Sequence, residues 1–190
     1  MNNIVRKLTY AALMLSAIIA AGCTVSYKFT GASIDYTKVK TISLETFQNR
    51  AAYQWGPMAT MFNEKLNDIF VQQTKLQQVS RGGDMQFAGE ITAYDQYNKS
   101  ISSDGYSSMV QLKMTVNVRF TNNTNHDEDF ERPFSATRDF DATQSLDSVQ
   151  EELVGQMIDE IVEAIFNAVK LFSIMIDEKI ISAAPVAPTI

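Results

Sequence analysis

The pattern that decides the fold lies at residues 108–120, with the sequence SMVQLKMTVNVRF. Apolar and polar side chains alternate along this stretch, as they do in a strand whose two faces have different surroundings. The apolar set comprises Val110, Leu112, Met114, Val116, Val118 and Phe120. The polar set comprises Gln111, Lys113, Thr115, Asn117 and Arg119. We therefore expect a strand in a sheet that is buried on one face and exposed to solvent on the other.

Two flanking segments show a similar alternation, and we expect them to be further strands. In residues 84–95 the apolar positions are Met85, Phe87, Ile91 and Ala93, and in residues 129–140 they are Phe130, Phe134, Ala136 and Phe140. Pro133 has no N–H to donate, so the second segment is expected to be an edge strand or to contain a bulge. Residues 96–107 and 121–128 are polar, and we expect a loop and a turn there.

Helical spacing replaces the alternation in two further segments. Residues 57–79 begin with Pro57, which suits the first position of a helix, and carry apolar side chains three and four residues apart. Residues 145–172 have the same spacing behind Ser145, a residue type that caps helix N-termini. With a further strand at 38–45, the order is β-α-β-β-β-α. This order predicts an α+β fold of two layers, with two helices packed on one face of a four-stranded mixed sheet.

The N-terminal 22 residues have the parts of an export signal. Arg6 and Lys7 make the start basic, and the 14 residues 8–21 form a mostly apolar run. A membrane-spanning helix needs about 20 apolar residues, so this run suits a signal peptide better. It leads to Gly22-Cys23, and the small residues before the cysteine resemble the lipobox of bacterial lipoproteins. That resemblance implies cleavage between Gly22 and Cys23 and acylation of Cys23, the alternative being an ordinary secretory signal cut nearby.

Lipidation would divide the chain into four parts. These are a lipoprotein signal peptide at 1–22, a lipidated N-terminus and tether at 23–37, an α+β domain at 38–172 and a C-terminal tail at 173–190. Cys23 is the only cysteine, and several acyl chains on one residue make a stable membrane anchor. Thr24 follows it, and in the sorting rule of well-studied envelopes the absence of Asp there implies transfer to the outer membrane. We expect a lipid-anchored protein on the periplasmic face of that membrane.

The charge balance argues against nucleic acid as a partner. The chain has 16 basic and 22 acidic residues, a net charge of −6. Loss of Arg6 and Lys7 with the signal would leave 14 basic residues against 22 acidic ones, a net charge of −8. Nonspecific nucleic-acid binding needs a basic surface, which such a chain does not favour.

The residue types of most catalytic and metal sites are sparse. His126 is the only histidine and lies in a polar turn, and the chain has neither a second cysteine nor a glycine-rich phosphate loop. A run of alternate residues has the spacing of a calcium loop but lacks its glycine and its bidentate glutamate. This run is Asn123, Asn125, Asp127 and Asp129. We therefore expect no enzyme activity, no cofactor and no metal.

Local motifs point to a family. After the first helix come Leu76-x-x-Val79, Gly83-Asp84 and Phe87-x-Gly89-x-Ile91-x-x-Tyr94. The central strand continues as Val116-x-Val118-Arg119-Phe120-Thr121-Asn122, followed by Phe130 and Phe134. Together with Gly22-Cys23 and the order of elements, residues 20–168 resemble the LptE family, the lipopolysaccharide-assembly lipoproteins of the outer membrane. The stretch after Ala168 departs from the family pattern, in which the chain ends soon after the helix.

The resemblance implies a function without catalysis. It implies a partner, the large outer-membrane β-barrel LptD, inside which the lipoprotein sits as a plug. It also implies that the protein helps the barrel to fold and binds lipopolysaccharide before insertion. The alternative is a generic periplasm-facing binding or structural lipoprotein with no barrel partner.

Four cationic residues are candidates for contact with lipid A phosphates. Lys113 and Arg119 share the polar face of the central strand, and Arg132 and Arg138 lie on the next strand in an unknown register. Cations on adjacent strands would converge on an anionic ligand through charge-assisted hydrogen bonds. The alternative is that they pair with acidic residues of the same sheet, namely Glu90, Glu131 and Asp139.

Overall fold

The computed structural model describes residues 34–101 and 107–183, and within them the side chains of 34–99 and 109–170. The expected signal peptide at 1–22 and most of the expected tether at 23–37 lie outside these residues. The elements are β1 (Thr41–Leu44), β2 (Gln48–Asn49), α2 (Met58–Gln73), β3 (Gln77–Gln78), β4 (Met85–Ile101), β5 (Ser107–Asn122), the 3-10 helix η1 (His126–Glu128), β6 (Phe130–Asp141) and α3 (Leu146–Ala183).

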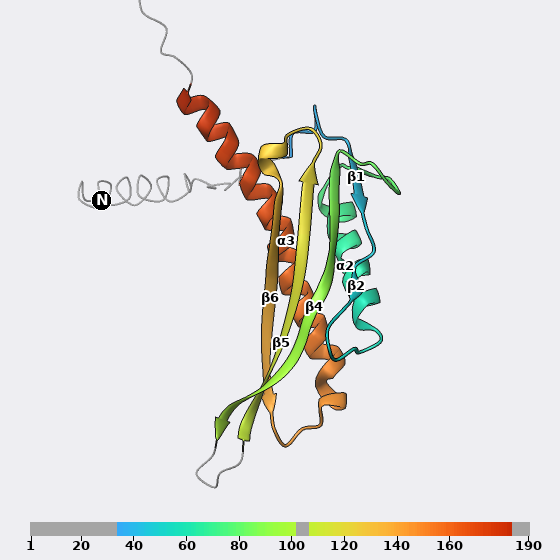
Figure 1. Ribbon diagram of the computed structural model, residues 1–190, viewed down its shortest axis with the longest axis vertical. Coiled ribbons are helices and arrows are strands. Elements are labelled where there is room, and N and C mark those ends of the chain that lie inside the picture. Colours follow the sequence, from blue (N-terminus) through green and yellow to red (C-terminus); the bar gives the residue numbers. More distant parts are fainter. Residues whose placement is uncertain (1–33, 102–106, 184–190) are drawn as a thin grey trace, which may run out of the picture. The chain divides into compact units, whose positions relative to one another are not determined.

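The strands form one mixed sheet with the order β3-β1-β4-β5-β6, and β2 also pairs with β4. β1 runs parallel to β3 and β4, and β2 runs parallel to β4, whereas β5 runs antiparallel to both β4 and β6. Both helices lie behind this sheet in Figure 1. The α+β class and the two-layer arrangement are therefore confirmed. The sheet has six strands instead of four, because β2 and β3 are two-residue strands that carry no alternation for the sequence to reveal.

Aromatic side chains join the two layers. Phe70 of α2 packs on Phe87 of β4 with ring centroids 4.9 Å apart, and Phe87 packs on Phe120 of β5 at 4.8 Å. Phe166 of α3 meets Phe70 edge-on at 5.4 Å. Phe70, Phe87 and Phe120 are each no more than 2 % exposed, so the apolar stripes of the helices and the apolar face of the sheet form one core.

A β-bulge changes which residues of β4 face this core. Ile91 lies opposite Val116 and Ala93 lies opposite Thr115, so Thr92 is an extra residue in β4. The expectation that Ala93 shares a face with Ile91 is wrong. Tyr94 takes that position instead and is 2 % exposed. The bulge shifts the two-residue period by one, which a simple alternation does not anticipate.

The boundaries of the expected loop and turn also differ. Residues 96–101 are strand and not loop, because β4 continues to pair with β5 through Tyr97 opposite Gln111. The turn expected at 121–128 begins only after β5 ends at Asn122, and it contains η1. Polar side chains continue a strand there because pairing with a neighbour, and not burial, supplies the backbone hydrogen bonds.

The helix expected at 57–79 ends at Gln73. The Thr74 hydroxyl donates to the Phe70 carbonyl at 2.6 Å, and Gln77–Gln78 then pairs with β1 as β3. α3 continues past the expected domain end at residue 172 and reaches Ala183. Within the described residues, no helix has the length and apolarity needed to cross a membrane.

Candidate functional site

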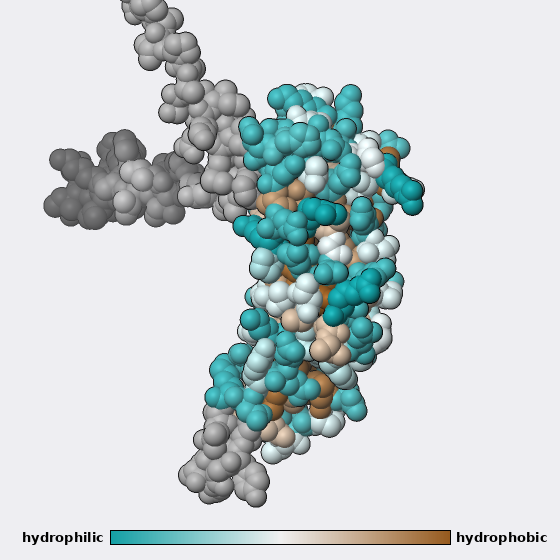
Figure 2. Space-filling model, viewed as in Figure 1, coloured by the Kyte–Doolittle hydropathy of each residue, from teal (hydrophilic) through white to brown (hydrophobic). Residues whose placement is uncertain are grey.

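The face of the sheet that the helices leave uncovered is polar. On β5 it carries Thr115 and Asn117, and the Thr115 hydroxyl lies 2.9 Å from the Ser135 hydroxyl on β6. The Asn117 amide donates to Glu131 at 3.2 Å. Figure 2 shows this side of the molecule as mainly hydrophilic. We call it the open face, because its hydroxyl, amide and charged groups are available to a hydrated partner.

Lys113 and Arg119 both lie on the open face, and both are exposed. Lys113 is opposite Asp95 of β4 and Thr137 of β6, and Arg119 is opposite Glu131 of β6. The two cations are six positions apart along the strand, which is about 20 Å. One phosphate group is too small to bridge that span, so each cation would contact a different group of any ligand.

Arg119 lies in a polar depression of about 290 Å³ that is also lined by Glu45, Glu90 and Glu131. Among the described residues neither Arg119 nor Lys113 forms an ion pair. The alternative of pairing with acidic residues of the sheet is therefore not realised as an ion pair for Arg119, although Glu90 and Glu131 line the same depression.

Arg132 and Arg138 lie on the opposite face of the sheet. The register places Arg132 opposite Val118 and Arg138 opposite Leu112, and directly opposed residues of antiparallel strands share a face. The Arg132 guanidinium lies over the ring of Phe134, 4.8 Å from its centroid. The expected convergence of all four cations is therefore wrong. The reason is the two-residue period, which sends odd-numbered and even-numbered positions to different faces once the register is fixed.

Arg138 connects the sheet to α3. Its guanidinium donates to Glu160 at 2.7 Å and to Gln156 at 3.1 Å. The ion pair with Glu160 holds the edge of β6 against α3, so this arginine already has a structural partner.

An ion pair between β4 and β6 spans the open face. Asp139 of β6 binds Lys99 of β4, and it accepts a 2.9 Å hydrogen bond from Gln111 of β5. Hydrogen bonds from Lys99 and then Gln111 hold the pKa of Asp139 below its ordinary value. Lys99 is absent from the candidates derived from the sequence because residues 96–107 are expected there to form a loop. Its signal was the continued alternation of Asp95, Tyr97 and Lys99.

The turn with calcium-like spacing is held by its own hydrogen bonds. Asp129 accepts from the Asn122 backbone N–H at 2.6 Å, and its second oxygen lies 2.9 Å from His126 Nδ1. Asn125 accepts from the Asp127 backbone N–H at 3.3 Å. These oxygens shape the connection between β5 and β6, and the part of the chain with described side chains contains no cluster of metal-binding residues.

Gly22 and Cys23, the expected cleavage and lipidation residues, lie outside the described residues.

Comparison with known families and structures connects this fold to a biological process. A family model described as "LptE: Lipopolysaccharide-assembly" matches residues 39–169. No curated protein matches the chain. The solved structures include a hypothetical protein, CT253, from Chlamydia trachomatis, which is 11 % identical with a TM-score of 0.53 and covers 71 % of this chain and 98 % of its own.

Two other similar structures are lipoproteins. Lipoprotein B from Nitrosomonas europaea is 12 % identical with a TM-score of 0.50, covering 78 % of this chain and 92 % of its own. The rare lipoprotein B from Shewanella oneidensis is 12 % identical with a TM-score of 0.50, covering 73 % of this chain and 99 % of its own. At these identities the structures establish a shared fold. The family match extends from the turn before β1 far into α3, and the chain therefore belongs to the LptE lipopolysaccharide-assembly family.

Proposed function

We propose that this protein is an outer-membrane lipoprotein that partners an LptD-like β-barrel as plug and assembly factor in lipopolysaccharide transport and insertion. The observation that carries the proposal is the family match over residues 39–169, which includes the whole sheet and most of the packed part of α3. In this role the protein supplies a surface and catalyses no reaction.

The open face has the chemistry that a barrel interior accepts. The lumen of an outer-membrane barrel is polar, and its lining exchanges hydrogen bonds with water or with a plug. Hydroxyl and amide side chains such as Thr115, Asn117 and Ser135 can make such bonds without burying an unpaired charge. The helical layer supports the sheet from the other side and keeps this surface rigid.

The lipid anchor supplies the location. In the proposal, residues 1–22 are removed and acylated Cys23 holds the domain at the periplasmic face of the outer membrane through the tether at 23–37. Confinement to the membrane plane raises the effective concentration of the protein at the barrel, as a linker does between two binding modules.

Lipopolysaccharide contact is assigned to separate cations and not to one cluster. Lys113 and Arg119 would each contact an anionic group along the open face. Arg132 and Arg138 would contact anionic groups on the other face of the sheet. Lys113→Glu is expected to weaken lipopolysaccharide binding more than Arg119→Glu, because carboxylates already surround Arg119. Binding of the purified variants to lipopolysaccharide, with Lys75→Glu as a control outside the sheet, measures this. Unchanged binding in both variants would remove the open face from the ligand site.

The partnership is tested by purification from membranes. The full chain would carry a C-terminal tag and be extracted from the outer membrane in mild detergent. A stoichiometric large β-barrel in the eluate, together with loss of surface lipopolysaccharide on depletion, is the expected result. Recovery of the lipoprotein alone, from membranes that contain such a barrel, would contradict the proposal and favour a generic lipoprotein.

A further inference from the structure

Among the described residues, β3 covers the outer edge of β1 only along its first part. β3 pairs with β1 at Thr41 and Ile42, and the last backbone hydrogen bond on that side runs from the Val79 N–H to the Ile42 carbonyl at 2.9 Å. Backbone groups of alternate residues face the same edge of a strand, so those of Leu44 face the side that β3 has left. No described backbone hydrogen bond reaches Leu44 from there.

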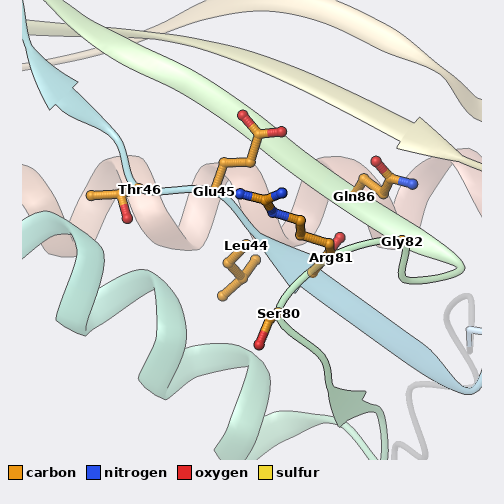
Figure 3. Close-up of a pocket in the computed structure, with 8 residues that line it drawn as sticks. Leu44, Glu45, Thr46, Ser80, Arg81, Gly82 and Gln86 are labelled. Atoms are coloured by element: carbon orange, nitrogen blue, oxygen red, sulfur yellow. The ribbon is translucent and has the colours of Figure 1, made fainter.

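Two pockets lie beside this uncovered edge. The first, of about 650 Å³, is lined by Ser43, Leu44, Glu45, Thr46, Ser80, Arg81, Gly82 and Gln86 (Figure 3). The second, of about 300 Å³, is lined by Leu44, Glu45, Thr46, Asn63, Glu64, Leu66, Asn67 and Gln78. Leu44, Glu45 and Thr46 belong to both, so the two hollows flank the same three residues. This is the space that a longer β3 would fill.

Polar groups in this space are arranged for a polypeptide backbone. The Asn63 side chain of α2 makes the two hydrogen bonds that a neighbouring strand would make. It accepts from the Phe47 N–H at 2.8 Å and donates to the Phe47 carbonyl at 2.9 Å. One turn along α2, the side-chain oxygen of Asn67 is buried and has no described hydrogen-bond partner. A buried acceptor without a donor costs free energy that an incoming N–H would recover.

We propose that the Leu44–Thr46 edge is a strand-addition site for an extended peptide segment of a partner protein, with an acidic side chain placed at Arg81. Main-chain hydrogen bonds to β1 would supply the affinity, and the two pockets would receive alternate side chains. Arg81 is exposed, extends over β1 toward Glu45 in Figure 3, and forms no ion pair among the described residues. It is the cation on the pocket wall, which is why the peptide is assigned an acidic residue.

The shape of the site favours a single strand over another ligand. α2 bounds it on one side and residues 80–82 bound it on the other, so the space beside Leu44 is confined between two segments of the chain. The gap from Ser43 to Thr46 is four residues, or about 13 Å, which matches a short extended segment.

Peptide binding to the isotope-labelled full chain, followed by nuclear magnetic resonance, tests the proposal. The probe is the capped pentapeptide Thr-Val-Glu-Val-Thr, with two versions in which alternate backbone nitrogens are methylated. Strand addition predicts a downfield shift of the Leu44 amide proton and loss of binding in only one methylated version, because only one edge of the peptide faces β1. Equal binding of both versions, shifts confined to the β6 edge, or no shift at millimolar peptide would overturn the proposal.

Charge variants test the role of Arg81. Arg81→Glu is expected to weaken binding of the Glu peptide by about three- to fivefold and to strengthen binding of a Lys peptide. Arg50→Glu is the matched control, because Arg50 is also exposed but lines neither pocket. Equal effects of the two variants would show that net charge alone steers the peptide, and would remove Arg81 from the site. If the chain self-associates and the peptide competes with that association, the occupant of the site is a second copy of this chain and not a partner protein. That result would overturn the proposed occupant.

Discussion

At the scale of single residues, Gly89 lies where β4 and β5 approach each other closely. A Cβ atom at this position would lie 2.1 Å from the Asn117 carbonyl oxygen and 2.5 Å from Cε1 of Phe47. The carbonyl belongs to the paired strand and cannot move without breaking the ladder. Only glycine fits between these two neighbours, whatever its backbone dihedral angles.

Gly89→Ala is therefore expected to destabilise the protein by about 1–3 kcal/mol, as overpacking in a rigid site does. Gly56→Ala is the matched control, because nothing lies within 4 Å of a Cβ built at Gly56. Urea unfolding followed by circular dichroism compares the two. Equal midpoints for the two variants would show that β4 and β5 can separate locally.

Asp84 acts on the start of β1. Its carboxylate accepts from the backbone N–H of Lys40 at 2.8 Å, from that of Thr41 at 2.9 Å and from the Thr41 hydroxyl at 2.9 Å. These bonds hold the pKa of Asp84 below its ordinary value, because they favour the ionised form. The stabilisation is therefore present above the unfolded-state pKa, about 4, and is lost as the pH falls through the lower folded-state pKa.

Asp84→Asn is expected to lower the melting temperature at pH 7 and to reduce its fall between pH 5 and pH 3, because an amide has no charge to lose. Asp127→Asn, in the turn before β6, is the comparison. Melting curves measured across this pH range give the result. A variant that loses as much stability as the wild type on acidification would place the acid-sensitive group elsewhere.

At the scale of an element, the bulge in β4 decides which side chains reach the core. Thr92 is the extra residue, since Ile91 and Ala93 oppose the consecutive residues Val116 and Thr115. Removal of Thr92 would leave all these pairs in place and make the alternation regular. β5 and β6 have no such irregularity between Met109 and Phe120.

Deletion of Thr92 is therefore expected to be tolerated, with a loss in the ordinary range for one residue, about 0.5–3 kcal/mol. Deletion of Asn117 from β5 is expected to prevent folding, because it exchanges the two faces of every residue on one side of the deletion. Yield of folded protein and the unfolding midpoint separate the two outcomes. A folded Asn117 deletion would mean that β5 can form a compensating bulge.

At the scale of the whole molecule, the two layers share one aromatic core. Phe87 of the sheet contacts Phe70 of α2 and Phe120 of β5, and Phe70 contacts Phe166 of α3. A residue in the middle of such a chain stabilises both layers, so they are expected to unfold together.

Phe87→Ala is expected to lower the free energy of unfolding by about 3–5 kcal/mol. The unfolding midpoints of the helix signal and of the Trp55 fluorescence should fall by the same amount. Val71→Ala on α2 is the control, since Val71 is 58 % exposed and its loss should cost less than about 0.5 kcal/mol. Circular dichroism reports the helices and strands, and fluorescence of Trp55 reports the connection between β2 and α2. Separate transitions in the variant would show that the layers are only weakly coupled.

The sequence alone determined the fold class and the alternating strand that became β5, since alternation and helical spacing record which side chains avoid water. Pro133 left an edge strand and a bulge as alternatives for β6, and the sheet order decided for the edge. The family resemblance carried by its local motifs is likewise confirmed by the match over residues 39–169. Tertiary structure alone decided the register, the bulge at Thr92, the short strands β2 and β3, and the separation of Arg132 and Arg138 from Lys113 and Arg119. These features depend on which backbone groups meet across the sheet, and hydrogen-bond pairing between distant segments leaves no periodic trace in either segment.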